Sequence, residues 1–326
     1  MKKRKKQISV ILFLLVVLSF LLLLSDTLLS GKDKKIYNIS IITRGRNSES
    51  LTIMKEGIDQ AASEVNANIS FITLSEENSV EEQKELIARE INNKADAIII
   101  SPVDYEKMAE PIENAMKKVP VILIESTVKS EQVLSNISCD NYKLGVSLAE
   151  EMVQMGNTRS NIAIVKNNLE CSSIKERYDG FMSVMKNTEN TYTFLKISGQ
   201  KQVTSYNEAK NFIKENDVDA VVTFDAGILE LIAQAKKDLS IVSKEKAAVE
   251  IYGTGSTSKI ISFLEDKVIN ATAMQNEFNV GYLGVKTAVG MINRKHIDNG
   301  TISSTVINTQ NMYYQDNQRL LFPLIR

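Results

Sequence analysis

The feature that most constrains the fold is a regular alternation of short apolar runs, rich in β-branched residues, with amphipathic stretches. Runs such as YNISIITR (37–44) and VPVILIES (119–126) are nearly continuously apolar, which is typical of parallel strands covered on both faces by helices. Strands and helices that alternate in this way predict repeated βαβ units. The pattern starts at residue 37 and continues almost to the end of the chain.

The expected elements follow from this pattern. We expect strands at 37–44, 69–75, 95–103, 119–126, 161–167, 191–198, 219–226, 247–253, 270–275 and 301–309. We expect helices at 50–65, 80–93, 105–118, 142–154, 172–185, 208–214, 228–235, 258–265 and 280–293. About 290 residues are too many for one typical core, and no Pro/Gly/Ser-rich linker separates independent domains. The fold class expected is therefore α/β, with two doubly wound, Rossmann-like lobes.

The N-terminus carries a basic cluster, MKKRKK, followed by an uncharged run of nineteen residues from Gln7 to Ser25. A helix of that length covers roughly 28 Å, about the hydrocarbon thickness of a bilayer. We therefore expect residues 1–31 to form a cytoplasmic basic cluster and a single-pass signal-anchor in the cell membrane, with the rest of the chain outside. A cleaved signal is the alternative, although Ser30 and Gly31 form only a weak cleavage site. Both interpretations export the domain.

Charge and metal-ligand content exclude two further classes. Residues 1–35 hold eight of the 39 Lys and Arg residues and two of the 40 Asp and Glu residues, so 31 cations and 38 anions remain, a net charge of −7. Such a domain repels nucleic acid. Cys139, Cys171 and His296 are the chain's only Cys and His residues, which disfavours a zinc site. We expect neither metal nor cofactor, and we expect the cysteines to be buried free thiols.

Polar residues follow several of the predicted strands, at the edge where doubly wound sheets bind ligands. The candidate ligand-binding residues at strand ends are Arg44, Ser48, Glu125, Asp225 and Gln275. Any one of them could instead cap the following helix, but their occurrence at the ends of several strands favours a shared site.

Arg177 is a different kind of candidate because it lies inside a predicted helix, CSSIKERYDGF. Its planar head can bridge two hydroxyls or a carboxylate. A surface salt bridge to Glu176 or Asp179 is the alternative.

The sequence contains little that resembles a known catalytic motif. The chain has no G-x-S-x-G, and His296 lies in a polar connection, so a Ser-His-Asp system has no well-placed base. The turn GTGST (253–257) could bind an anion, but a tight turn with a Ser/Thr helix cap is the better interpretation. We expect no enzyme. Glu125 and Asp225 would allow a hydrolase only if they lay about 5–10 Å apart.

Several segments together resemble the type I periplasmic binding proteins, and most closely the ribose/galactose class of sugar-binding subunits of ABC transporters. The resemblance is carried by the order and spacing of ISIITRGRNSESLTIMKEGID, AIIISPVDYEKMAEPIENAMKKVPVILIES, SCDNYKLGVSLAEEM, KERYDGF and NATAMQNEFNVGYLGVKTA. It implies two lobes joined by a three-segment hinge, with the ligand in the cleft between them. By this resemblance lobe 1 comprises 36–138 and 276–308, and lobe 2 comprises 139–275 and 309–326.

The resemblance also implies roles for single residues. Arg177 matches the family's ligand-binding arginine, Gln275 its hinge glutamine and Glu125 the acidic residue after strand four, while Asp225 stands where relatives have Asn or Asp. The chain departs from the family at Ser48-Glu49-Ser50-Leu51, where relatives carry ring-stacking aromatics, which puts an ordinary hexose or ribose in doubt.

Two further departures bear on charge. Ser126 replaces an arginine often paired with the strand-four acid, and Arg44 replaces a small polar residue. Arg44 with Arg177 leaves room for an acidic or phosphorylated ligand.

These features predict an extracytoplasmic solute-binding protein for a sugar or related polar small molecule. Its partner would be an ABC permease, for carbohydrate import, or a membrane histidine kinase, for chemosensing, and the anchor slightly favours the kinase. The alternatives are an extracellular hydrolase and a protein-interaction module without a ligand. A transcriptional regulator on the same fold is disfavoured because the N-terminus carries an apolar segment and no helix-turn-helix.

Overall fold

The described part of the chain comprises residues 35–45, 49–133, 135–198, 202–295 and 301–321, with Leu15, Val17 and Ser19, in a computed structural model. Residues 37–326 form one compact unit, distinct from residues 1–36. Within the described ranges, no helix is both long enough and apolar enough to cross a membrane. Most of the predicted anchor, 7–25, lies outside these ranges.

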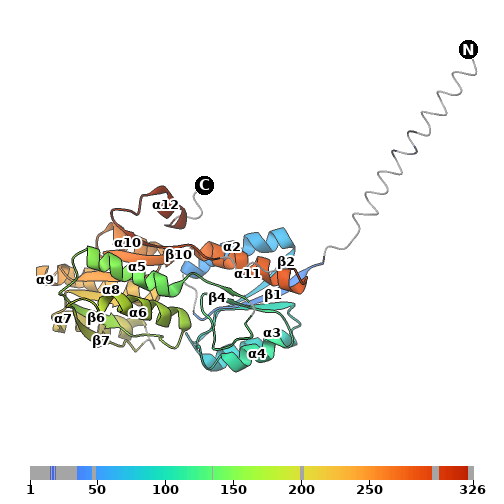
Figure 1. The fold of residues 1–326 in the computed structure, drawn as a ribbon, viewed down its shortest axis with the longest axis horizontal. Coiled ribbons are helices and arrows are strands. Elements are labelled where there is room, and N and C mark those ends of the chain that lie inside the picture. Colours follow the sequence, from blue (N-terminus) through green and yellow to red (C-terminus); the bar gives the residue numbers. More distant parts are fainter. Residues whose placement is uncertain are drawn as a thin grey trace, which may run out of the picture. The chain divides into compact units, whose positions relative to one another are not determined.

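The first sheet has five parallel strands in the order β2-β1-β3-β4-β5. Helices α2 and α11, which are far apart in the sequence, pack together on one face, and α3 and α4 cover the other (Figure 1). The strands are β1 (Tyr37–Ile42), β2 (Ala67–Ile72), β3 (Ala97–Ile100), β4 (Val121–Ile124) and β5 (Asn136–Ile137). The helices are α2 (Glu49–Val65), α3 (Val80–Asn92), α4 (Ala109–Met116) and α11 (Glu277–Ile292).

The second sheet has six strands in the order β11-β10-β9-β8-β6-β7, and all pairs are parallel except β10 with β11. The strands are β6 (Asn161–Val165), β7 (Thr191–Leu195), β8 (Ala220–Thr223), β9 (Glu250–Thr254), β10 (Ala271–Gln275) and β11 (Ser304–Asn308). Helices α5 (Asn141–Gln154) and α6 (Ser172–Met185) pack together on one face. The other face carries α7 (Gln202–Glu215), α8 (Ala226–Ser240) and α10 (Ser258–Glu265). Two short helices complete this part of the chain, α9 (Lys244–Ala247) between α8 and β9 and α12 (Gln315–Leu321) after β11.

The strands bury both faces, as their apolar sequences predict. In β1, Ile39 and Ile41 belong to the core beneath α2 and α11, whereas Ile42 belongs to the core on the side of α3 and α4. Successive side chains of a strand point to opposite faces, so a continuous apolar run supplies two cores at once. This explains why the strands could be recognised from sequence.

Each predicted strand and helix is present, with strand ends that are mostly shorter than expected, whereas β5, α9 and α12 were not predicted. Helix α8 extends to Ser240 rather than ending at residue 235. Lys236, the first residue beyond the predicted end, is buried, and its Nζ donates to the carbonyl oxygen of Val268 at 3.0 Å. Its long aliphatic stem lies in the core while its charged end finds a backbone partner.

The predicted lobe boundary differs from the structure at β11. We expected 276–308 in the first lobe, and α11 does pack on the first sheet. Strand β11, however, pairs with β10 from Gln275↔Ser304 to Ala271↔Asn308 and therefore belongs to the second sheet. The chain returns from α11 to the opposite end of β10, which makes this pair antiparallel and places the last crossing before residue 304.

Candidate functional site

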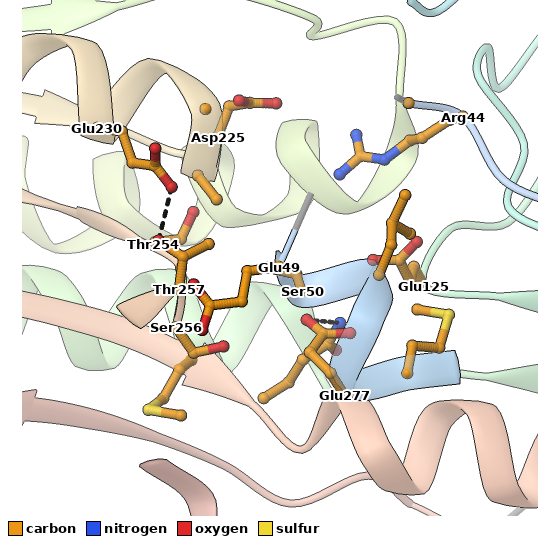
Figure 2. A pocket seen from close by; sticks show the side chains of 18 of the residues that line it. Arg44, Glu49, Ser50, Glu125, Asp225, Glu230, Thr254, Ser256, Thr257 and Glu277 are labelled. Carbon is orange, nitrogen blue, oxygen red and sulfur yellow. Dashed lines mark hydrogen bonds between the residues drawn. The ribbon is translucent and has the colours of Figure 1, made fainter. Parts of the chain in front are cut away.

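A cavity of about 430 Å³ lies between the two lobes and is lined by residues of both. It forms where the carboxyl ends of the parallel strands in the two sheets face each other, the position at which α/β folds bind ligands. Among its lining residues are the predicted site residues Arg44, Glu125, Arg177, Asp225 and Gln275. The sixth, Ser48, lies outside the described residues. Figure 2 shows Arg44, Glu125 and Asp225 around the same space.

Arg177 lies on α6 and is 8% exposed, so it is not a surface residue. Of the two acids considered for a surface salt bridge, Asp179 pairs with Lys175 instead. The Nε of Arg177 donates to Oδ1 of Asn141 at 2.8 Å, while Nδ2 of Asn141 donates to the backbone oxygen of Glu125 at 3.3 Å. One amide therefore fixes the guanidinium and connects it to the other lobe.

The position of Arg177 also depends on the close approach of α5 and α6. A Cβ at Gly145 would lie 2.0 Å from the backbone oxygen of Arg177, and one at Gly180 would lie 2.0 Å from the backbone oxygen of Tyr142. Only glycine permits both contacts. The helix pair therefore holds the arginine at a depth set by backbone packing.

Glu125 follows β4 and has a positive φ of 60°, which is uncommon for a residue other than glycine, asparagine or aspartate. Its backbone is held on both sides: its N–H donates to Ile137 at 3.0 Å, and its carbonyl oxygen accepts from Ser138 Oγ at 2.8 Å. Its side-chain Oε2 accepts from Ser101 Oγ at 2.9 Å. Such a conformation persists where surrounding contacts enforce it, and functional sites are common among such places.

Arg44 is half-buried at the end of β1, and its Nη1 lies 3.2 Å from Cys171 Sγ. Burial opposes its charge, but the neighbouring Cys171, Glu125 and Asp225 together hold the pKa of Arg44 above its usual range. It therefore remains a cation facing several acidic groups.

Glu277, the first residue of α11, was missed by the sequence analysis although it stands two positions after Gln275. Burial, and next the charge of Glu125, raise the pKa of Glu277 to about 8, against the lowering effects of Gln275, Arg177 and Arg44. Its Oε1 accepts from Gln275 Nε2 at 3.2 Å. Its position just after the end of a predicted strand, close to Gln275, was the signal that could have identified it.

Among the described residues, four that line the cavity carry a buried side-chain oxygen with no hydrogen-bond partner: Asn78 Oδ1, Thr254 Oγ1, Gln275 Oε1 and Glu277 Oε2. Asn78 Oδ1 and Gln275 Oε1 are pure acceptors, whereas the threonine hydroxyl and a carboxyl group that holds a proton can each accept or donate. Buried polar atoms are almost always paired in native proteins. These atoms therefore mark the cavity as a place for a hydrogen-bond donor.

The two lobes also contact each other directly beside the cavity. The carboxylate of Glu49, on α2, accepts from the backbone N–H of Ser258, on α10, at 2.7 Å, and also from its hydroxyl. Elsewhere, Ser126 Oγ after β4 lies 2.8 Å from Ser173 Oγ on α6 and 2.9 Å from Cys171 Sγ. The lobes are thus in a closed arrangement.

Residues 39–296 match a protein family described as "Periplasmic binding protein domain". The chain belongs to this family. The prediction of the family is thereby confirmed, as is that of a binding protein rather than an enzyme.

A curated relative is the xylitol-binding protein of Mycolicibacterium smegmatis, which is 25% identical over 179 residues. That match covers 54% of this chain and 51% of the relative, so the chain spans about half the length of the relative it matches.

Solved structures share the whole fold. A carbohydrate transporter solute-binding protein of Agrobacterium radiobacter in complex with D-arabinose has a TM-score of 0.80 at 22% identity, covering 87% of this chain and 98% of that one. A solute-binding protein of Agrobacterium vitis with bound D-fucose has a TM-score of 0.81 at 20% identity, covering 87% and 99%. The XylFII–LytSN complex matches with a TM-score of 0.76 at 24% identity, covering 85% and 99%.

The remaining sequence predictions concern the glycine-containing turn, the cysteines and the histidine. Thr257 caps α10 by accepting from the N–H of Ile260 at 3.2 Å, as predicted, but the turn also contributes Thr254, Gly255 and Ser256 to the cavity. Both cysteines are free and buried, as predicted. His296 lies outside the described residues. In the part of the chain that is described, no cluster of three or more His, Cys, Asp or Glu could hold a metal ion.

Proposed function

We propose that this protein is an extracytoplasmic solute-binding protein that captures a polyhydroxylated small molecule, a sugar or polyol, between its lobes and does not transform it. The observation that carries the proposal is the set of buried acceptors without partners in the cavity. An unsatisfied buried polar group costs about 1–3 kcal/mol. A ligand that donates to several of them recovers that cost, so binding and lobe closure stabilise each other.

Hydroxyl groups fit this cavity better than other neutral groups. Each hydroxyl can donate to an unpartnered oxygen such as Gln275 Oε1 and accept from a guanidinium such as Arg177 at the same time. A polyol places many such groups on a small frame. The relatives' ligands named above, D-arabinose, D-fucose and xylitol, are of this chemical class.

The apolar residues that line the cavity further restrict the class of ligand that fits it. The described lining residues include Leu51, Met54, Leu144 and Met274 but no aromatic residue. Aromatic faces recognise the apolar face of a ring by stacking, and their absence here matches the loss of aromatics at Ser48–Leu51. A ligand that depends on hydrogen bonds alone, such as an open-chain polyol, therefore suits the cavity better than a stacked pyranose.

The proposal includes a location and a partner. Residues 1–31 would form the single-pass signal-anchor predicted from sequence, so the lobes would stay attached to the outer face of the cell membrane. A tethered binding protein can act beside an importer permease or on a membrane sensor kinase, and we favour the sensor. The XylFII–LytSN complex supports a role in which this fold binds a second protein.

Membrane fractionation tests the anchor. The full chain should remain with membranes after high-salt washing and be released only by detergent, with its N-terminal sequence intact. Release by salt, or a mature N-terminus near residue 31, would contradict the anchor without affecting the binding role.

A thermal-melt screen tests the binding role. The full chain in detergent is heated with neutral sugars, polyols, sugar acids and sugar phosphates in turn. A ligand at a hundred times its dissociation constant adds about 2.7 kcal/mol of stability, which corresponds to several degrees in Tm. We expect a shift with polyhydroxylated compounds. Release of a product from a bound glycoside would instead support a hydrolase, and the absence of any shift would contradict the proposal.

A further inference from the structure

The cavity is strongly acidic. Among the described residues, its lining includes six carboxyl groups and three cations, Arg44, Arg177 and Lys259. The carboxylates are Glu49, Glu77, Glu125, Asp225, Glu230 and Glu277. A surplus of negative charge at this density disfavours the acidic or phosphorylated ligand that the two arginines alone suggested, because like charges repel most strongly where water is excluded.

Several of these carboxylates already have protein partners. Glu49 binds Ser258 in the other lobe, Glu230 accepts from Thr257 Oγ1 at 2.6 Å (dashed in Figure 2), and Asp225 caps α8 by accepting from Ile228 N–H at 3.2 Å. These contacts are structural and do not call for a ligand.

Glu125 and Glu277 each accept one hydrogen bond, from Ser101 and Gln275, but their charges oppose each other. They lie near enough for the charge of Glu125 to oppose ionisation of Glu277, and Glu277 Oε2 is buried without a hydrogen-bond partner. The cations that face Glu277 are Arg44 and Arg177. Arg44 donates to Cys171 and Arg177 donates to Asn141, and neither of these bonds reaches Glu277.

A second observation, independent of the acidic residues, points to a donor at the same place. Gln275 and Thr254 line the cavity and are 3% and 2% exposed, and the buried side-chain oxygen of each has no hydrogen-bond partner among the described residues. Metal chemistry does not fit, because the described residues offer no cluster of three ligands. The missing component is thus a small group with both positive charge and several hydrogen-bond donors.

We propose that the solute is a polyhydroxylated amine, an amino sugar or aminopolyol, whose ammonium lies between Glu125 and Glu277. An ammonium carries three donors and no acceptor, so it can satisfy Glu277 Oε2, Gln275 Oε1 and Glu125 together. Its charge balances the carboxylate pair, while the hydroxyls bind the arginines. This inference rests on the proposed function and names the ligand class of the same cleft.

Titration calorimetry with matched probes tests the inference on the full chain in detergent. The pairs are D-glucosamine with D-glucose, and 1-amino-1-deoxy-D-glucitol with D-glucitol. N-acetyl-D-glucosamine is the third probe of the first series, since it keeps the nitrogen and loses the charge. We expect at least one amine to bind at least tenfold more tightly than its neutral parent, and N-acetylation to abolish that gain.

The Glu277→Gln variant separates charge recognition from shape. It keeps the size of the side chain and removes the charge, so the affinity for the amine relative to its neutral parent should fall to about one. Glu85→Gln is the matched control, because Glu85 is exposed on α3 and does not line the cavity. It should retain the full preference.

Proton release provides a second readout. Because the pKa of Glu277 is raised to about 8 by burial and Glu125, the unliganded residue holds a proton at pH 7 and should release it when an ammonium binds. Titrations in buffers of different ionisation enthalpy should show release of about one proton, and none with Glu277→Gln.

The outcomes distinguish the two proposals. Neutral parents that bind as tightly as their amines, or an amine preference that survives in Glu277→Gln, would overturn this inference and leave the proposed function intact. A complete lack of binding across both series and the broader panel of sugars and polyols would overturn the proposed function, and this inference with it.

Discussion

At the scale of single residues, burial and the charge of Glu125 disfavour the ionised form of Glu277. Its pKa is raised in the folded state, so the folded protein holds a proton that the unfolded chain releases above about pH 4.5. Stability therefore falls as pH rises from about 4.5 to about 8, because the unfolded state binds fewer protons in that range. Below this range the residue is neutral in both states and has no effect.

We predict that Glu277→Gln flattens this part of the stability profile. Denaturant unfolding of the unliganded protein should show a wild-type free energy of unfolding that declines, relative to the variant, by up to about 1.4 kcal/mol per pH unit between pH 5 and 8. The variant should be the more stable protein at pH 8. Parallel profiles for the two proteins would mean that Glu277 ionises normally.

Several site residues could be predicted from the sequence. Arg44, Glu125, Asp225 and Gln275 were predicted because each ends an apolar strand, and parallel strands bring their carboxyl ends together. The raised pKa of Glu277 could not be predicted, since it arises from burial and from the proximity of Glu125, which is 152 positions away in the sequence.

At the scale of secondary-structure elements, the crossing of α5 and α6 determines where Arg177 lies. We predict that Gly145→Ala destabilises the protein by about 1–3 kcal/mol, because the new methyl group would meet the backbone oxygen of Arg177 at 2.0 Å. The displaced helix should also weaken ligand binding about tenfold or more. Thermal melts and titration calorimetry measure the two effects.

Gly290→Ala is the matched control in a helix. Gly290 lies in α11, and nothing stands within 4 Å of a Cβ built there. This change should leave affinity unaltered and stabilise the fold by about 0.4–1 kcal/mol, because alanine restricts the unfolded chain. An equal loss of stability in both variants would contradict the packing argument.

Element boundaries were predicted less well than element types. The first turns of α7, from Gln202, are mostly polar, and although Tyr206 packs against the core, Val203 is exposed. The two-residue strand β5 is defined by its pairing with β4 and not by a local pattern. Such features depend on tertiary contacts that a local reading does not contain.

At the scale of the whole molecule, the bond from Glu49 to Ser258 joins two lobes through residues 209 positions apart. We predict that Glu49→Ala weakens ligand affinity up to about fivefold, since a net hydrogen bond contributes about 1 kcal/mol to the closed arrangement. Solution scattering should show a more open unliganded protein. Glu56→Ala on the same helix, away from the cavity, should change neither quantity. A Glu49→Ala protein that stays closed would contradict a role of the Glu49–Ser258 bond in lobe closure.

The division into two lobes was predictable because both sheets repeat one pattern, but the path of the chain between them was not. Strand β11 was assigned to the wrong lobe because nothing in TISSTVINT distinguishes a strand beside β10 from one in the first sheet.

The measurement that tests the central claim most directly is calorimetric titration of the best-stabilising polyhydroxylated compound into the wild type and into Arg177→Ala. Arg177 lines the cleft, its Nε donates to Asn141, and it does not belong to the apolar core, so the variant should fold. We predict saturable one-to-one binding by the wild type and a loss of at least a hundredfold in the variant, with an unliganded Tm within a few degrees of the wild type. Unchanged affinity in a folded Arg177→Ala protein would show that the solute does not bind between the lobes.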